Sequence, residues 1–292
     1  MLISVLAAKK GLTDQKQFQQ FYEYYLNHRL PGTQLLSWRQ VAGKDADSSA
    51  TDGDLMVAQA LIQAYRLWPQ KKEYARQARR LLADILKYEY NAREKILTVG
   101  NWATAKSKYY DLMRTSDVMP AVFTQFYQFT GERKWLVIKQ KMLKRLDQLS
   151  KSNSSGLVPD FAWVKKGKAK PVKANTVATA YDGAYSANAC RVPMLLADSQ
   201  DKLSEQILRR MLSFFSKHVP LASGYTLNGE VINAKTIGSF SAPVFYAVNH
   251  YRNQSYDQLF LSEQHHFTDG LPKDNYYDAT LICLVALMNE KV

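Results

Sequence analysis

Residues 50–68 read ATDGDLMVAQALIQAYRLW, and this stretch decides the fold class. Its apolar residues recur every three or four positions, which is the period of an amphipathic helix. Asp52 and Asp54 open the helix, where a carboxylate can cap free amides and suits the helix dipole. The short polar break RLWPQKKEY leads into a second amphipathic run at 73–90. The stretch therefore predicts two antiparallel helices joined as a hairpin.

The same alternation continues along the chain. Short breaks lie within the hairpins, and longer connections rich in Gly, Ser and Asn lie between them. This pattern predicts one all-α domain over residues 1–292, a toroid of helical hairpins whose long loops form one face around a cleft. One β-hairpin is expected at YTLNGEVIN, around Asn228-Gly229. The predicted helices span residues 1–9, 14–28, 53–67, 73–90, 118–130, 134–149, 187–198, 202–217, 239–250, 256–261 and 275–290.

Composition limits the partners. The chain has 39 basic and 26 acidic residues, a formal charge of +13, which suits nucleic acid, an anionic polymer or an anionic cell surface. The basic residues are spread along helices and gather only in a loop at Lys165–Lys173, so we expect a solvated turn there and no nucleic-acid partner. The sequence contains no run of 18 apolar residues, so no membrane span is predicted. No CxxC motif is present, and neither a metal site nor a cofactor is expected.

The segment at residues 50–68 resembles the signature of glycoside hydrolase family 8, the family of inverting cellulases, lichenases, xylanases and chitosanases. Further stretches match the family in the right order, and together they cover essentially the whole chain. These stretches are Leu36-Ser37-Trp38, Arg114-Thr115-Ser116-Asp117 with Met119-Pro120, Gly156-Leu157-Val158-Pro159-Asp160-Phe161, and Asn188-Ala189-Cys190-Arg191-Val192-Pro193.

The resemblance implies an (α/α)6 toroid, and it bears on the N-terminal sequence MLISVLAAKK. In the family, the general acid is a Glu just before the stretch that MLISVLAA resembles, at the start of an inner helix. Met1 therefore matches the Met after that motif. We expect the acid Glu and the first outer helix of the toroid to lie upstream of Met1. MLISVLAAKK itself lacks a basic n-region and a cleavage site, so it is interpreted as structure and not as a signal peptide.

The second catalytic carboxylate stays open between two residues. One branch of the family has an Asp as base at the position that matches Asn188, and an Asn cannot accept that proton. Asp182, in the loop YDGAYSANA, and Asp117, in TSD, are the two candidates for the base. The structural alternatives are an Asx-type turn for Asp182 and a helix N-cap for Asp117.

The remaining predicted site residues would hold the sugar. Asp52 is expected to bind hydroxyls at the cleavage point and to favour a distorted ring. Arg191 could pair with a carboxylate and keep it ionised, or lie on the solvated side of its helix. Loop aromatics suit stacking on the apolar faces of sugar rings, although they could also anchor their loops. The predicted substrate-binding residues are Trp38, Trp102, Tyr109, Tyr181, Tyr185, Asn188 and Arg191.

The resemblance implies an inverting glycosidase that cleaves internal β-1,4 bonds of a cellulose-type or mixed-linkage β-glucan. Xylan and chitosan remain open as substrates, and repulsion between like charges disfavours cationic chitosan. Two alternatives are kept: an inactive glycan-binding protein, and a polysaccharide lyase acting on an anionic glycan. The family implies an extracellular or cell-surface location. The sequence does not indicate an oligomeric state.

Overall fold

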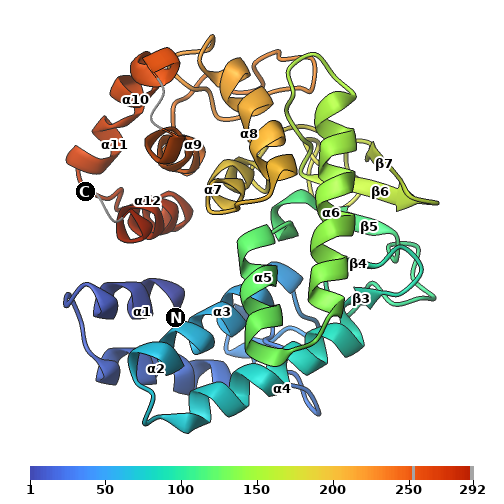
Figure 1. Ribbon diagram of the computed structural model, residues 1–292, viewed down its shortest axis with the longest axis vertical. Helices are drawn as coiled ribbons and strands as arrows, with labels where there is room; N and C mark the ends of the chain where they lie inside the picture. The colour runs from blue at the N-terminus through green and yellow to red at the C-terminus, as the bar shows by residue number, and fades with distance from the viewer. Residues whose placement is uncertain (252–253, 290–292) are drawn as a thin grey trace. The chain divides into compact units, whose positions relative to one another are not determined.

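A computed structural model describes residues 1–251 and 254–289, and Figure 1 labels its helices and strands. The predicted domain over residues 1–292 extends past this described part of the chain. Residue 290, at the end of the predicted helix 275–290, also lies outside the described residues. Each predicted helix has a counterpart among the described ones.

The chain divides into two compact units. Unit 1 consists of Met1–Leu112 and Thr124–Ile138, and unit 2 consists of Met113–Phe123 and Lys139–Val292. Both units are therefore discontinuous in sequence. Helices α5 (Pro120–Thr130) and α6 (Lys134–Lys151) are divided between them. That the chain forms a single domain remains a prediction.

Unit 1 is built on the predicted hairpin. Helix α3 packs against α4 and α1, because its buried face is lined by small and aliphatic side chains such as Leu55, Ala58 and Leu61. Asp14 caps α2 by accepting from the backbone N–H of Gln17 at 3.0 Å. The elements of this unit are α1 (Leu2–Lys9), α2 (Gln15–Asn27), β1 (Gln40–Val41), β2 (Lys44–Asp45), α3 (Thr51–Leu67), α4 (Lys72–Tyr88), β3 (Tyr90–Asn91) and β4 (Ile96–Leu97).

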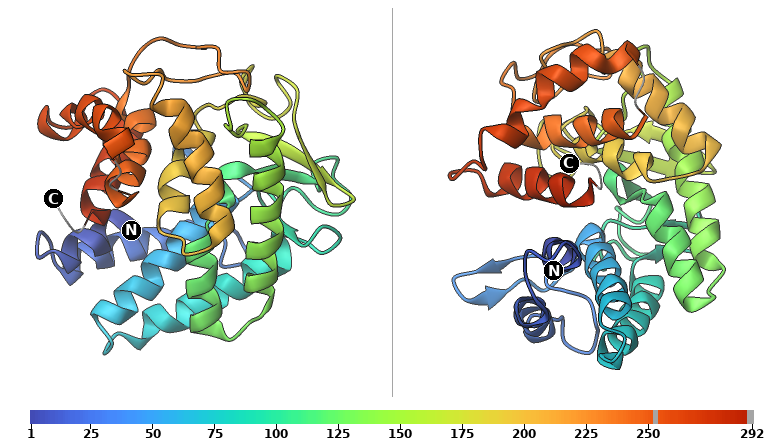
Figure 2. Two further views of the ribbon diagram at one scale, coloured as in Figure 1. Left: turned by 45° about the horizontal axis from the view of Figure 1, so that its top comes forward. Right: turned by 60° about the vertical axis from the view of Figure 1, so that its left-hand side comes forward.

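Unit 2 is organised around α9, which lies beside α7, α10 and α12 (Figures 1 and 2). The predicted helix 187–198 is split into η2 and α7, and Pro193 stands in the first turn of α7, where a missing N–H is tolerated. The elements from the start of β5 onward are β5 (Leu112–Arg114), η1 (Thr115–Asp117), α5 (Pro120–Thr130), α6 (Lys134–Lys151), β6 (Phe161–Lys165), β7 (Lys168–Pro171), η2 (Ala189–Arg191), α7 (Val192–Ala197), α8 (Lys202–Phe215), α9 (Gly238–Tyr251), η3 (Gln254–Tyr256), α10 (Asp257–Glu263), α11 (His265–Thr268) and α12 (Tyr276–Met288).

The three-stranded sheet β5-β6-β7 is the main departure from the predicted loops. The β6–β7 hairpin turns at Lys166 and Gly167, whose φ angles of 48° and 74° are those of a two-residue type I′ turn. Its lysines are exposed, as the predicted solvated turn required. Trp163 lies in β6, in a stretch between predicted helices where the sequence predicts a loop. The predicted hairpin at Asn228-Gly229 forms as a turn with one isolated bridge, from Tyr225 to Val231.

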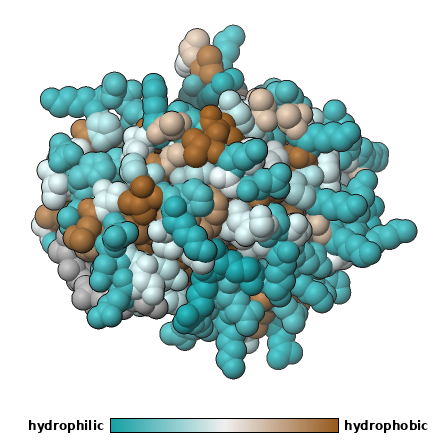
Figure 3. All heavy atoms as spheres, turned by 90° about the horizontal axis from the view of Figure 1, so that it is seen from above, coloured by the Kyte–Doolittle hydropathy of each residue, from teal (hydrophilic) through white to brown (hydrophobic). Residues whose placement is uncertain are grey.

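The surface drawn in Figure 3 is mostly hydrophilic, with apolar groups scattered among charged and polar ones. Within the part of the chain that the structure describes, no helix is both long and apolar enough to cross a membrane.

Candidate active site

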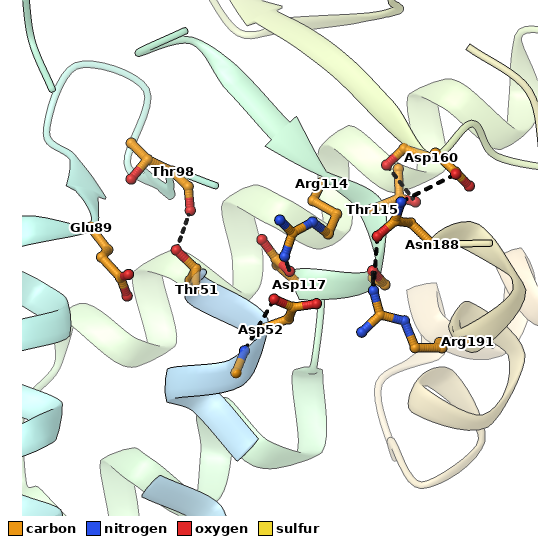
Figure 4. Close-up of polar contacts among 12 residues, drawn as sticks. Thr51, Asp52, Glu89, Thr98, Arg114, Thr115, Asp117, Asp160, Asn188 and Arg191 are labelled. Atoms are coloured by element: carbon orange, nitrogen blue, oxygen red, sulfur yellow. Dashed lines mark hydrogen bonds and ion pairs between the residues drawn. The ribbon is translucent and has the colours of Figure 1, made fainter. Parts of the chain in front are cut away.

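Asp52 lies in the first turn of α3, in unit 1 (Figure 4). The helix begins after Ala50, which provides no side-chain cap, and the Thr51 hydroxyl donates to the carbonyl of Thr98 at 2.7 Å. The Asp52 carboxylate accepts from the backbone N–H of Gly53 at 3.1 Å. Asp52 is therefore not the N-cap residue of α3, although its carboxylate accepts from one amide of the first turn.

The second carboxyl of this motif, Asp54, is fully buried. It accepts from the backbone N–H of Leu36 at 2.8 Å. Burial, followed by the charge of Glu89, raises the pKa of Asp54 well above its usual value. Sequence reasoning missed Glu89, which directly follows α4, because nothing in a helix-end Glu indicates a buried partner 35 positions earlier in the chain.

Two predicted sugar-binding aromatics of unit 1 are open to solvent. Trp38 is 51% exposed, with the guanidinium of Arg39 4.6 Å from its ring centroid. Trp102 is 37% exposed and packs edge-on against Tyr109, with ring centroids 5.2 Å apart. These rings therefore have exposed surface that a sugar could contact, as the predicted role requires.

In unit 2, the predicted residues Asp117, Asn188 and Arg191 come together (Figure 4). The buried Arg191 side chain donates to the Ser116 hydroxyl at 2.7 Å and to the Asn188 side-chain oxygen at 3.0 Å. Asp117 is buried and pairs with Arg114 at 3.4 Å. The solvated alternative for Arg191 is thus wrong.

Asp160 completes this cluster, although it was not among the predicted site residues. Its carboxylate accepts from the backbone N–H groups of Ser186 and Ala189, at 3.0 and 2.7 Å, and from the Asn188 amide at 3.2 Å. Burial raises the pKa of Asp160 to about 6, against the opposing effect of these hydrogen bonds. The sequence showed the acid in GLVPD, but its partners lie 26 to 29 residues further along.

Asp182 is held inside its own loop. It is buried, and its oxygens accept from the backbone N–H groups of Val177, Ala178 and Thr179 at 2.6, 3.1 and 3.0 Å. These donors lie three to five positions before Asp182, so the contacts differ from the Asx-type turn that the sequence offered, which would engage an N–H after it. The arrangement orders the loop and engages both carboxylate oxygens.

The last two predicted tyrosines differ. Tyr181 is 47% exposed, so its ring is available to a ligand. Tyr185 is 1% exposed and packs against Phe215, Tyr225 and Phe240. The prediction that Tyr185 binds substrate is wrong, because its ring belongs to the core of unit 2.

The groups described here can transfer protons and hydrogen-bond to hydroxyls. Across residues 1–251 and 254–289, no group of three or more His, Cys, Asp or Glu side chains is placed to hold a metal ion.

Comparison with known proteins identifies the family. The model of "Glycosyl hydrolases family 8" matches residues 1–291. A β-glucanase of Niallia circulans is 28% identical over 96% of this chain and 72% of its own length. Endoglucanase A of Acetivibrio thermocellus is 25% identical over 90% of this chain. This chain spans 55% of the length of that endoglucanase.

Solved structures agree. A β-1,3-1,4-glucanase from Paenibacillus sp. X4 superposes with a TM-score of 0.90 at 27% identity, covering 99% of this chain and 79% of that one. An endo-1,4-D-glucanase from Vibrio fischeri ES114 gives a TM-score of 0.79 at 21% identity, covering 98% and 84%. The predicted fold class, the (α/α)6 toroid of the family, is thereby confirmed. The chain belongs to family 8 of the glycosyl hydrolases.

Proposed function

We propose that this chain is the catalytic part of an inverting endo-β-glucanase, acting on internal β-1,4 bonds of a cellulose-type or mixed-linkage β-glucan. The observation that carries the proposal is the family match over residues 1–291. Relatives that bear the names β-glucanase and endoglucanase support the choice of substrate. The exposed rings of Trp38, Trp102 and Tyr181 suit stacking on glucose units. Because the substrate is a polymer, we place the protein outside the cell or at its surface.

Inversion requires one protonated carboxyl and a second carboxylate about 6.5–9.5 Å from it, which activates water on the opposite face of the sugar. We assign Asp117 as the base. Its ion pair with Arg114 favours the ionised form that a base needs. The neighbouring residue Ser116 accepts a hydrogen bond from Arg191, which also donates to Asn188. That the acid is a Glu upstream of Met1 stays a prediction.

Paired substitutions separate Asp117 from the other candidate. In the protein as its host produces it, Asp117→Asn is expected to lower kcat by about a hundredfold or more, because the amide cannot accept the proton of the attacking water. Asp182→Asn is expected to keep kcat within about tenfold and to lower the melting temperature, because an amide nitrogen replaces one acceptor of the loop N–H groups. Full activity of Asp117→Asn, or loss of activity in Asp182→Asn without loss of stability, would reverse the assignment.

The function itself is tested on mixed-linkage β-glucan and carboxymethylcellulose. We expect release of reducing ends, with proton NMR showing that the first product has the anomeric configuration opposite to that of the substrate. Oligosaccharide binding without release of reducing ends would indicate the inactive glycan-binding alternative. An unsaturated product absorbing in the ultraviolet would indicate a lyase. The intact mass of the same preparation, compared with 33.3 kDa, shows whether residues precede Met1 in the host's protein.

A further inference from the structure

Two carboxyl groups meet in the interior of unit 1. The Asp54 and Glu89 side chains are both fully buried, and they hydrogen-bond to each other. Two carboxylates in contact away from water repel strongly, so a pair of this kind retains a proton that a lone surface carboxyl would lose.

Each carboxyl also holds a loop. Asp54 accepts from the backbone N–H of Leu36, two residues before Trp38. Glu89 accepts from the Ser49 hydroxyl at 2.6 Å. The pair thus joins the start of the Trp38 loop to the segment that leads into Asp52.

Ser49 extends the connection to a third segment. Its hydroxyl accepts from the backbone N–H of Asn101 at 3.1 Å, and its own N–H donates to the Asn101 side chain at 3.0 Å. The approach is close, since a Cβ on Gly100 would fall 2.4 Å from the Ser49 carbonyl oxygen. Trp102 directly follows Asn101 in the sequence. Glu89 therefore connects, through one hydroxyl, to the loop of the second exposed tryptophan.

We propose that Asp54 and Glu89 are positioning residues that share one proton, and that this shared proton keeps the Trp38 and Trp102 loops and the Asp52 segment in their glycan-binding arrangement. The inference rests on the proposed function for what these loops bind. When the proton is lost to solvent at higher pH, two adjacent buried carboxylates remain, and their repulsion acts directly on Leu36 and Ser49.

The surroundings of Asp54 define which groups affect its ionisation. Glu89 and Asp52 add negative charge, and the Tyr25 hydroxyl of α2 also interacts electrostatically with Asp54. Tyr25 donates to the Gln34 carbonyl at 2.7 Å, so it holds the same loop from the other side. Helix α1, which also packs on α3, buries the uncharged residues Ser4 and Val5. Arg29 acts on Tyr25 in the opposite sense. The charges that act directly on Asp54, those of Glu89 and Asp52, are negative and favour keeping the proton.

The first test measures stability against pH and needs no substrate. Because the folded pKa of Asp54 is raised, its contribution to stability is present below about pH 4 and is lost as the pH rises through the folded value. We expect the melting temperature of the wild type to fall over this range, and that of Asp54→Asn to change less, because the amide imitates the protonated acid. The matched control is Asp84→Asn, a half-buried carboxyl that accepts from the N–H of Gln34 in the same loop. It should follow the wild type.

The second test follows the loops themselves. The part of the tryptophan fluorescence that Trp102→Phe removes is expected to shift with pH in the wild type and in Asp84→Asn, but not in Asp54→Asn. In kinetics on mixed-linkage β-glucan, KM of the wild type should rise about threefold or more over the same pH range, while KM of Asp54→Asn stays nearly constant. Asp54→Ala, which loses both hydrogen bonds, should show a raised KM at every pH.

The outcomes separate the two proposals. An Asp54→Asn variant whose stability and fluorescence titrate like the wild type overturns the shared proton. Titration that disappears in Asp54→Asn without any change in the KM profile overturns the positioning role. Absence of β-glucan hydrolysis in every variant, with the stability and fluorescence results as expected, overturns the proposed substrate and leaves the proton-sharing pair in place.

Discussion

Replacing Asp52 with Asn in the protein as its host produces it is expected to lower kcat on mixed-linkage β-glucan by about a thousandfold. Contacts that strengthen on a distorted sugar ring supply several kcal/mol to the transition state, and a loss of about 4 kcal/mol corresponds to that factor. An amide is uncharged and binds hydroxyls more weakly than a carboxylate does.

The same substitution should leave folding nearly intact. Asp52 is not the N-cap residue of α3, and an Asn oxygen can still accept from the N–H of Gly53. The lost interaction of the charge with the helix dipole amounts to about 0.3–1 kcal/mol at an accessible site. Steady-state kinetics and thermal unfolding of the same preparation check both parts. Unimpaired turnover, or inactivity accompanied by unfolding, would contradict the assignment of Asp52 to the sugar.

Replacing Asp160 with Ala is expected to lower the free energy of unfolding by several kcal/mol. Three donors, the N–H groups of Ser186 and Ala189 and the amide of Asn188, lose their acceptor, at about 1–3 kcal/mol each where they are buried. This loss is partly offset, because the variant no longer buries a charged carboxylate in the interior. A folded pKa of about 6, compared with about 3.8 unfolded, costs the wild type about 3 kcal/mol above pH 7.

The sign of this second term predicts a pH dependence. A raised folded pKa means that the wild type loses stability as the pH rises from about 4 to about 6, whereas the variant has no such group to titrate. The difference in unfolding free energy between wild type and Asp160→Ala should therefore be largest near pH 4 and smaller by about 3 kcal/mol near pH 7.5. Urea unfolding at both pH values measures it. A difference that does not depend on pH would contradict the buried, titrating carboxyl.

Sequence reasoning succeeded where the signal is local. The period of residues 50–68 predicted α3, and Asp14 was at the predicted start of α2. It failed where a residue's role depends on a distant partner. Glu89 bonds Ser49, 40 positions away, and Asp160 bonds a turn more than 25 positions away, so neither appeared as special in its own segment.

The errors among the aromatics have the same origin. A tyrosine in a polar loop can face solvent, as Tyr181 does, or turn inward, as Tyr185 does, and the local sequence does not distinguish the two. Trp163 lies in a strand because its hairpin is closed by Lys166 and Gly167, a turn that the surrounding lysines obscured. For Asp182, N–H groups three to five positions earlier in the loop bind the carboxylate, an arrangement that neither predicted role anticipated.

The interleaving of the two units has a consequence for synthesis on the ribosome. The chain leaves unit 1 at Leu112 and returns to it for Thr124–Ile138, so the first unit lacks part of itself until that later stretch has emerged. Unit 2 in turn includes Met113–Phe123, which are made before unit 1 is finished. Domains usually fold as contiguous units, the N-terminal one first. Here neither unit can complete its fold before the α5–α6 hairpin has been synthesised. The emergence of that hairpin is therefore the earliest point at which unit 1 can fold completely.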